Sequence, residues 1–423
     1  MNFRKYVGIA LLIVAVVGLF SVAAAQDAPS GDLEIFSWWA GGGEAAGLEA
    51  LIARFSEMYP GVNIINSAVS GGSGVNARAV LATRLQADDP PGTFQVHAGS
   101  ALNDLWVAAD KMESLNFIYE ANGWLEQYPQ GLLDLISADG EIYAVPVNIH
   151  RSNVMWYIPA NLEEWGVTVP ASWEEFLTDT CPTLQAAGVV PLSVGLTWTQ
   201  MHLWESVALA ELGPEAYAGL WTGDTAWDSE EVAGVFDTYS QVLACTNDDR
   251  DAIDWQPATL MVVEGEAAFN VMGDWAAGYL LELGLEPETG FGWVASPGTE
   301  GSFMMLSDAF GLPKGAPNRD AVVAWLTFLG SAEAQDIFNP LKGSLPANLT
   351  ADLSNTELYN AYFQSAAADW SSNAIVGSLA HEAVGAGEFQ NGFAELIAQL
   401  GAGCEPATAA AVAVELAAET LAE

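Results

Sequence analysis

The sequence predicts an α/β protein of two domains that is exported from the cytoplasm. A basic and then apolar segment opens the chain, a strand–helix–strand pattern follows soon after it, and the second half is mainly helical. At 423 residues the chain is long enough for two domains, each with its own hydrophobic core. Its hydrophobic content of 51% argues against a disordered chain.

The first 25 residues have the pattern of a secretory signal peptide. Arg4 and Lys5 precede an apolar run over residues 7–20, and Ala23 and Ala25 form an A-x-A cleavage site. The run is shorter than the ~18–20 residues that span a bilayer, so cleavage near Ala25 is favoured over a membrane anchor. No cysteine lies at the cleavage point to carry a lipid. We therefore expect the protein in the periplasm or on the extracellular side of the cell envelope.

The net charge restricts the classes of molecule that the protein can bind. The chain has 54 acidic and 11 basic residues, a net charge of −43. Removal of the signal peptide takes away two of the basic residues and no acid, which leaves −45. Such a surface repels nucleic acid, anionic membranes and anionic ligands. Lys342 is one of only three lysines outside the signal peptide, so we expect it to have a charged or hydroxyl partner.

The three cysteines predict one disulfide in an oxidising compartment. Cys181 and Cys245 lie in one continuous segment and are the expected pair, which leaves Cys404 as the free thiol. No CxxC spacing is present, so no structural zinc site is expected.

The segment after the signal peptide predicts a parallel βαβ unit. Alternating residues predict a strand over Leu33–Trp39, and three glycines (Gly41–Gly43) then open an amphipathic helix that ends at Pro60-Gly61. A second strand follows over Val62–Val69. A helix over Val75–Gln86 and a strand over Thr93–His97 continue this pattern, which favours a doubly wound sheet.

Beyond about residue 150 the patterns are mostly helical. Helices are predicted at Trp173–Ala187, Thr199–Ala210, Glu230–Leu243, Pro257–Glu264, Arg319–Leu329 and Ala407–Leu421. Short strands are predicted at Ala268–Val271 and Phe303–Leu312.

The strand ends carry the candidate binding residues. Ligands of open α/β sheets sit at the carboxyl ends of strands, where Trp38 and Trp39 fall, with Glu44 at the start of the next helix. An indole face stacks on the C–H face of a sugar ring, and a carboxylate accepts from its hydroxyls. Gln95 and His97 share one face of a later strand and offer donors and acceptors to such a ligand.

Catalytic motifs do not stand out. The chain has no GxSxG, HExxH, Walker or Rossmann glycine motif, and its four histidines show no metal or catalytic spacing. The glycine loop before Glu44 lacks the GK[ST] ending of a phosphate-binding loop. Because 54 acids are present, a secreted hydrolase with paired carboxylates remains an alternative. An acidic cell-surface structural protein is a third reading, against which the absence of repeats argues.

Several segments resemble the extracellular solute-binding proteins of carbohydrate ABC importers, and in particular the glucose/mannose-binding branch. The stretches that carry the resemblance are LEIFSWWAGGGEAAGLEAL, TFQVHAG, YAVPVNIHRSNVMWY, FNVMGDWAAGY, SDAFGLPKGAPN and KGSLPA. They cover most of the mature chain in the same order as in the family.

The resemblance implies a periplasmic-binding-protein-like fold, with two α/β lobes, a hinge and a sugar cleft between them. The expected first lobe comprises residues 26–146 plus about 304–341, and the second comprises 147–303 plus about 342–423. It also implies that Trp38 and Trp39 stack on or border the sugar and that Glu44 accepts from its hydroxyls. By the same resemblance the remaining contacts are Gln95, His97, Trp255, Asp308, Lys342 and His381, with Asp274 and Trp275 as wall residues. The glycine loop is a residue longer than the family pattern, which puts the place of Glu44 in question.

A function follows from this resemblance. We expect a monomer without metal, cofactor or catalytic residues that captures glucose or a similar hexose and delivers it to the permease subunits of an ABC importer. Mannose, galactose and a short oligosaccharide remain open as ligands.

Overall fold

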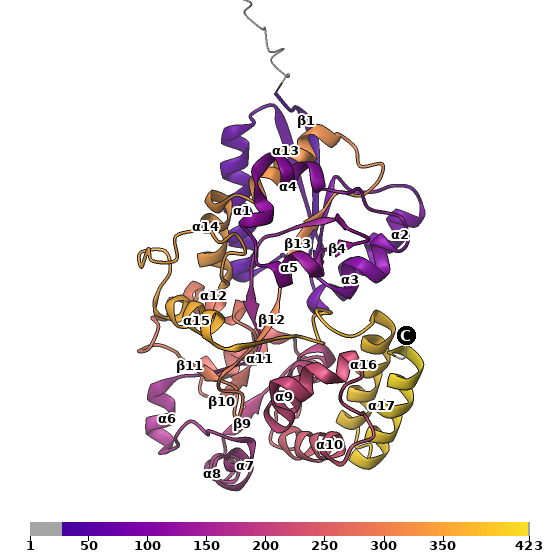
Figure 1. Cartoon of the computed structure of the whole chain (residues 1–423). Helices are drawn as coiled ribbons and strands as arrows, with labels where there is room; N and C mark the ends of the chain where they lie inside the picture. Colours follow the sequence, from indigo (N-terminus) through magenta and orange to yellow (C-terminus); the bar gives the residue numbers. More distant parts are fainter. Residues whose placement is uncertain (1–27, 422–423) are drawn as a thin grey trace, which may run out of the picture.

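The computed structural model describes residues 28–421 and divides into two lobes joined by crossing strands (Figure 1). The expected signal peptide lies outside the described residues. Within residues 28–421, no helix combines the length and the hydropathy that crossing a bilayer requires.

The first lobe is built on a five-stranded sheet with the order β2-β1-β3-β13-β6. Its strands are β1 (Gly31–Ser37), β2 (Val62–Ala68), β3 (Thr93–His97), β6 (Ala144–Pro146) and β13 (Asp308–Gly311). Strand β1 runs parallel to β2 and β3, whereas β13 runs antiparallel to β3 and β6. The predicted βαβ unit is therefore confirmed.

Helices cover this sheet on both sides. The long helices of the lobe are α1 (Gly42–Met58), α2 (Val75–Gln86), α13 (Arg319–Leu329) and α14 (Ala332–Lys342), and the short ones are α3 (Ser100–Leu102), α4 (Asn116–Asn122) and α5 (Gln130–Leu135). In Figure 1, α1 and α14 lie on one side of the strands and α2 and α3 on the other. Leu48, Leu51 and Phe55 form the buried face of α1, as their helical spacing predicts.

The second lobe combines a four-stranded sheet with a group of helices. The sheet has the order β11-β8-β10-β9, with β8 (Val154–Tyr157), β9 (Val190–Ser193), β10 (Ala267–Val271) and β11 (Gly292–Ala295). The helices are α6 (Pro159–Trp165), α7 (Trp173–Glu175), α8 (Cys181–Ala187), α9 (Thr197–Thr222), α10 (Glu230–Leu243), α11 (Trp255–Val263), α12 (Trp275–Glu282), α15 (Ala361–Ser372), α16 (Gly387–Gly401) and α17 (Pro406–Thr420). Helices α9, α10, α16 and α17 pack together around buried aromatic rings such as Trp204 and Phe393.

Three short strands connect the lobes. They are β7 (His150–Arg151), β12 (Ser302–Leu306) and β14 (Ala374–Gly377), in the order β14-β12-β7. The prediction of a single strand over Phe303–Leu312 is wrong, because this segment forms two strands, β12 and β13, that belong to different sheets. The chain changes sheet at Ser307, whose carbonyl accepts from Ala98 N–H and whose hydroxyl donates to the Asn148 carbonyl.

The segment after α14 stays with the first lobe before it reaches the second. Leu349 N–H donates to the Gln127 carbonyl, and the Tyr359 hydroxyl donates to Asp336 of α14. These contacts favour a later start for the last part of the second lobe than the expected position near 342.

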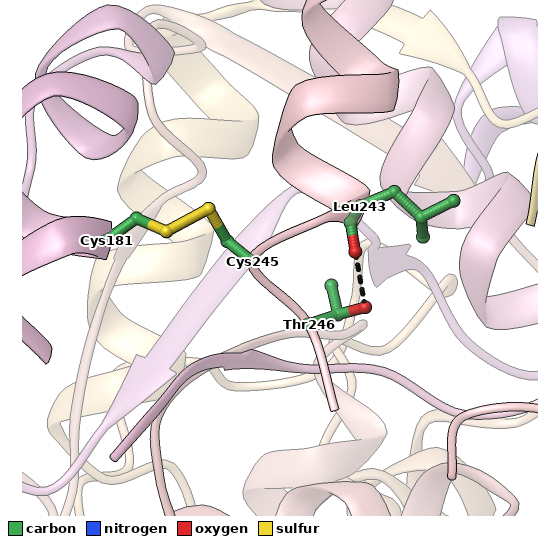
Figure 2. The surroundings of a disulfide bond; sticks show 4 residues. All are labelled: Cys181, Leu243, Cys245 and Thr246. Atoms are coloured by element: carbon green, nitrogen blue, oxygen red, sulfur yellow. Dashed lines mark hydrogen bonds between the residues drawn. A yellow bond between two sulfur atoms is a disulfide. The ribbon is translucent and has the colours of Figure 1, made fainter. Parts of the chain in front are cut away.

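The predicted disulfide joins Cys181 at the start of α8 to Cys245 after α10 (Figure 2). The Thr246 hydroxyl beside it donates to the Leu243 carbonyl. Cys404, by contrast, is a free and partly exposed thiol.

Candidate functional site

A cavity of about 230 Å³ lies between the two lobes. The first lobe supplies residues just after β1, the last residue of β3, the first residue of β13, the loop before α2, and the end of α14. The second lobe supplies the starts of α9, α11 and α12 and the turn after β14. The lining residues are Trp38, Ala40, Gly41, Glu44, Ser70, Gly71, Gly72, Gly74, His97, His150, Trp198, Asp254, Trp255, Gln256, Trp275, Leu306, Asp308, Lys342 and His381.

Four indole rings form the apolar part of the wall. Trp38 comes from the first lobe, and Trp198, Trp255 and Trp275 come from the second. The Trp275 ring lies centrally, with ring centres 6.1 Å from Trp198 and 6.5 Å from Trp255. The cavity is thus lined by aromatic side chains from both lobes.

Asp308 is the buried carboxylate of the site. Its two oxygens accept from Gln95 Nε2 and Asn148 Nδ2, each at 2.8 Å. Burial alone would raise the pKa of Asp308, but hydrogen bonding from His150 and the charge of Lys342 outweigh burial and hold the pKa well below its usual range. Asp308 is therefore an ionised acceptor at neutral pH.

Lys342 is the cationic group of the cavity and is 2% exposed. Its Nζ donates to Glu44 Oε1 at 2.7 Å and lies 5.5 Å from the centre of the Trp275 ring. The carboxylate and the π face compensate the buried ammonium, which would otherwise be costly to desolvate. The expectation that Lys342 has a charged partner is confirmed.

Glycines allow the helices that carry this ion pair to approach closely. A Cβ at Gly43 in α1 would lie 2.1 Å from the Leu341 carbonyl oxygen at the end of α14. Gly343, which ends α14, has a φ of +96° and would place a Cβ 2.3 Å from the Asp274 carbonyl oxygen. The glycine loop therefore serves helix packing, and Glu44 lies at the cavity.

Three of the four histidines, His97, His150 and His381, line the cavity, and His202 packs against His381, although the sequence spacing suggests no such group. The His381 ring lies 5.6 Å from that of His97 and 5.5 Å from that of His202. Burial, followed by the neighbouring histidines, lowers the pKa of His381 well below its usual value. His150 behaves differently: burial lowers its pKa, but Asp274, which contacts its Nδ1, outweighs burial and raises it.

Asp254 lines the cavity and links the two lobes. Its Oδ1 accepts from Trp255 N–H at 2.8 Å and from Trp198 Nε1 at 3.0 Å. Its Oδ2 accepts from the Gly72 N–H of the first lobe at 3.5 Å. Asp254 and Trp198 were missed by sequence reasoning, although the position of Asp254 beside Trp255, at the cap of a helix, was a usable signal.

Eight of the eleven predicted binding residues line the cavity: Trp38, Glu44, His97, Trp255, Trp275, Asp308, Lys342 and His381. The other three lie behind it. Trp39 is 1% exposed and packs against Phe310 and Phe338, which places its ring in the core. Gln95 accepts from Trp38 N–H and donates to Asp308, and Asp274 contacts His150. Gln95 and Asp274 therefore support lining residues.

One group has metal-ligand residue types. His202, Glu205 and His381 each bring one possible ligand atom within 4.8 Å of the others. Both carboxylate oxygens of Glu205 already accept hydrogen bonds, from Ser378, Leu379 and Ala380. These bonds favour a hydrogen-bonded network over a metal centre.

Comparisons with known proteins agree with this architecture. A probable sugar-binding periplasmic protein of Brucella suis biovar 1 is 32% identical over 374 residues, which cover 86% of each chain. The solved structure of the bacterial solute receptor AcbH, described as having an exclusive preference for β-D-galactopyranose, matches with a TM-score of 0.78 and 19% identity over 92% of this chain and 98% of that one. A chitin oligosaccharide binding protein matches with a TM-score of 0.79 and 19% identity over 92% and 99%.

At 19% identity these two structures show the fold alone, and the fold is the expected two-lobed one. The family model for bacterial extracellular solute-binding proteins matches residues 40–336, more than half of the chain. Together with the Brucella relative, this match shows that the chain belongs to the bacterial extracellular solute-binding protein family.

Proposed function

We propose that the protein captures a neutral monosaccharide, a hexose such as glucose, and delivers it unchanged to the permease of an ABC importer. The observation that carries this proposal is the interlobe cavity, which combines indole side chains from both lobes with buried hydrogen-bonding groups. The Brucella relative, named as sugar-binding and periplasmic, supports the ligand class and the location.

The chemistry of the lining suits a neutral polyol. Trp38, Trp255 and Trp275 offer flat apolar faces to the C–H side of a sugar ring. Asp308 offers ionised oxygens to hydroxyl donors, and Lys342 offers N–H groups to hydroxyl acceptors. Because Glu44 already pairs with Lys342, the charge of this lysine is compensated, which disfavours an anionic ligand.

The cavity size favours a single sugar ring. Pockets for drug-sized ligands enclose about 300–1,000 Å³, and this cavity encloses about 230 Å³. The structural neighbours include receptors described for a galactopyranose and for a chitin oligosaccharide, so their likeness does not select a sugar. Our choice of a glucose-like hexose rests on the resemblance to the glucose/mannose-binding branch and on this volume.

Binding closes the lobes in this proposal. The hydrogen bond from Gly72 N–H to Asp254 and the ion pair of Arg78 with Glu382 join residues of the two lobes and favour the closed form. A ligand that contacts both lobes shifts the open–closed equilibrium by its greater affinity for the closed state. The closed form is then the one that docks on the permease.

A hydrolase would need a protonated carboxyl group beside the scissile bond. Asp308, the buried carboxylate of the cavity, has a lowered pKa and is ionised, which disfavours it in that role. The binding and hydrolysis functions make different predictions for the fate of the sugar.

A ligand panel tests the proposal. Purified protein comprising residues 26–423 is heated in the presence of one neutral monosaccharide, disaccharide or glucoside at a time, and the shift of the thermal unfolding midpoint is recorded. Mass spectrometry of the sugars shows whether they are changed. We expect one or a few hexoses to raise the midpoint and to be recovered intact. Stabilisation only by oligosaccharides would reject the monosaccharide assignment, and cleavage of a glucoside would reject the transport function.

A further inference from the structure

Glu205 is a fully buried carboxyl group on α9 that the proposed binding site does not use. Its Oε1 accepts from the Ser378 hydroxyl at 2.7 Å. Its Oε2 accepts from the backbone N–H groups of Leu379 and Ala380 at 2.7 and 3.1 Å. The carboxyl group therefore holds the turn after β14 that ends at His381.

The hydrogen-bond directions in this turn are determined by chemistry. A carboxylate only accepts, so the single hydroxyl proton of Ser378 points to Glu205. The Ser378 oxygen is also 2.8 Å from His381 Nδ1 and must then accept from it. His381 consequently carries its proton on Nδ1, and Nε2 is left with a lone pair. This Nε2 is a buried atom without a hydrogen-bond partner among residues 28–421, and it belongs to a residue that lines the cavity.

We propose that Glu205 is a positioning residue that determines, through Ser378, which nitrogen of His381 carries the proton. The consequence for the ligand rests on the proposed function: with Glu205 ionised, His381 offers the sugar an acceptor and selects a hydroxyl that donates there.

The two hydrogen bonds that run from His381 through Ser378 to Glu205 form a relay. Protonation of Glu205 reverses the direction of both. Oε2 is occupied by two N–H donors, so the added proton resides on Oε1 and donates to Ser378. The Ser378 hydroxyl then donates to His381 Nδ1, which releases its own proton while Nε2 takes one up. The net change is one proton bound, on Glu205. The cavity now offers a donor at His381 instead of an acceptor.

This reversal falls near neutral pH. Burial raises the pKa of Glu205 to about 7, against the hydrogen bonds from Ser378, Ala380, Leu379 and Tyr217. The titratable groups around the relay are Tyr217, His202, His97, His150 and Asp308. His202 is not expected to titrate in the same range, because burial lowers its pKa to about 4. Its Nε2 donates to the Ser152 carbonyl at 2.7 Å, which fixes its tautomer independently.

The wild-type protein tests the relay without any substitution. Long-range ¹H–¹⁵N correlation spectra of protein with ¹⁵N-labelled histidine report which ring nitrogen is protonated, and a His381→Asn spectrum assigns the signals. In the ligand-free protein we expect the Nδ1–H form at about pH 8.5 and the Nε2–H form at about pH 5.5, on either side of the Glu205 pKa. One tautomer at both values, or a charged imidazolium at the lower one, would overturn the proposal.

Glu205→Gln provides the second test. The Gln amide keeps its oxygen toward the two backbone N–H groups and donates its N–H to Ser378, which mimics the protonated carboxyl. We expect the Nε2–H form at both pH values and roughly 10- to 100-fold weaker sugar binding at about pH 8.5, the range for one mismatched buried hydrogen bond. Glu211→Gln, at an exposed position of the same helix, should change neither result.

The outcomes separate this relay from its alternatives. A structural role of Glu205 alone would lower stability in Glu205→Gln and leave the His381 tautomer unchanged, which would refute the relay. A chelator-sensitive His381 spectrum would show a metal at His202, Glu205 and His381 and refute it as well. Because the spectra use ligand-free protein, failure of every sugar to bind would reject the proposed function and leave the relay to be judged by its own result.

Discussion

Lys342 Nζ and Glu44 Oε1 lie 2.7 Å apart and join the last turn of α14 to the first turn of α1 at the wall of the cavity. The lysine is almost completely buried, and the Glu44 side chain is 14% exposed. Under the proposed function the ion pair combines a structural and a ligand-binding role, and the two roles can be separated by measurement.

Replacement of Lys342 by Met should cost stability and sugar affinity together. Removal of one partner leaves Glu44 unpaired in a buried setting, for which we expect a loss of ~3 kcal/mol in the free energy of unfolding. Urea unfolding and a titration with the bound hexose measure the two effects. Lys314→Met is the matched control, because Lys314 forms its ion pair with Asp110 at the surface and should cost less than ~1 kcal/mol. Equal losses in both variants would contradict the role of Lys342.

Trp255 and Trp39 should respond in opposite ways to substitution by Ala. Trp255 lines the cavity, so Trp255→Ala should weaken hexose binding by at least ~30-fold. Trp39 packs in the core, so Trp39→Ala should lower the free energy of unfolding by ~3–5 kcal/mol and leave the affinity of the folded protein nearly unchanged. Calorimetric titration and urea unfolding of both variants check this, and a reversed pattern would mean that the cavity wall is misassigned.

His202 should make the protein less stable as the pH falls from 6.5 to 4. Burial lowers its pKa to about 4 in the folded protein, whereas the unfolded chain binds a proton near 6.5. The unfolded state therefore binds more protons in this window, and stability falls with falling pH by up to ~3 kcal/mol. The raised pKa of Glu205 changes the free energy of unfolding in the opposite direction over this pH window. Wild type and His202→Gln must therefore be compared by urea unfolding at each pH. We expect the variant to lose less stability than wild type on acidification, and parallel curves would refute this assignment.

Loss of the disulfide should destabilise the second lobe without changing the site. Cys181 and Cys245 are separated by 64 residues, and a loop of this length corresponds to about 4 kcal/mol of stability. The double variant Cys181→Ser/Cys245→Ser should therefore unfold at lower urea and bind the hexose with unchanged affinity once folded. Cys404→Ser, which removes the free thiol, should leave the urea midpoint unchanged.

Local patterns predicted the helices and strands of the first lobe well. The strand–helix–strand unit starts and ends within a few residues of its expected limits, because alternation and helical spacing are local properties. The prediction of one strand over Phe303–Leu312 failed because the chain bends at the buried Ser307 and continues in another sheet. This bend depends on Ala98 and Asn148, which are distant in sequence.

Site residues could be predicted where a side chain suited to sugar binding lies at the carboxyl end of a predicted strand. Trp38 and Trp39 are adjacent, and the pattern does not reveal which one turns toward the cavity. The structure assigns Trp39 to the core because its ring fits between Phe310 and Phe338. The gathering of His150 and His202 beside His381 brings together β7, α9 and the turn after β14, and no local spacing encodes it.

Calorimetric titration of purified protein comprising residues 26–423 with glucose, mannose and galactose is the most direct test of sugar capture. We predict binding of one sugar per chain for at least one of the three, with the sugar recovered chemically unchanged. Absence of binding heat for all three, at protein concentrations where the folded state is confirmed, would contradict the account.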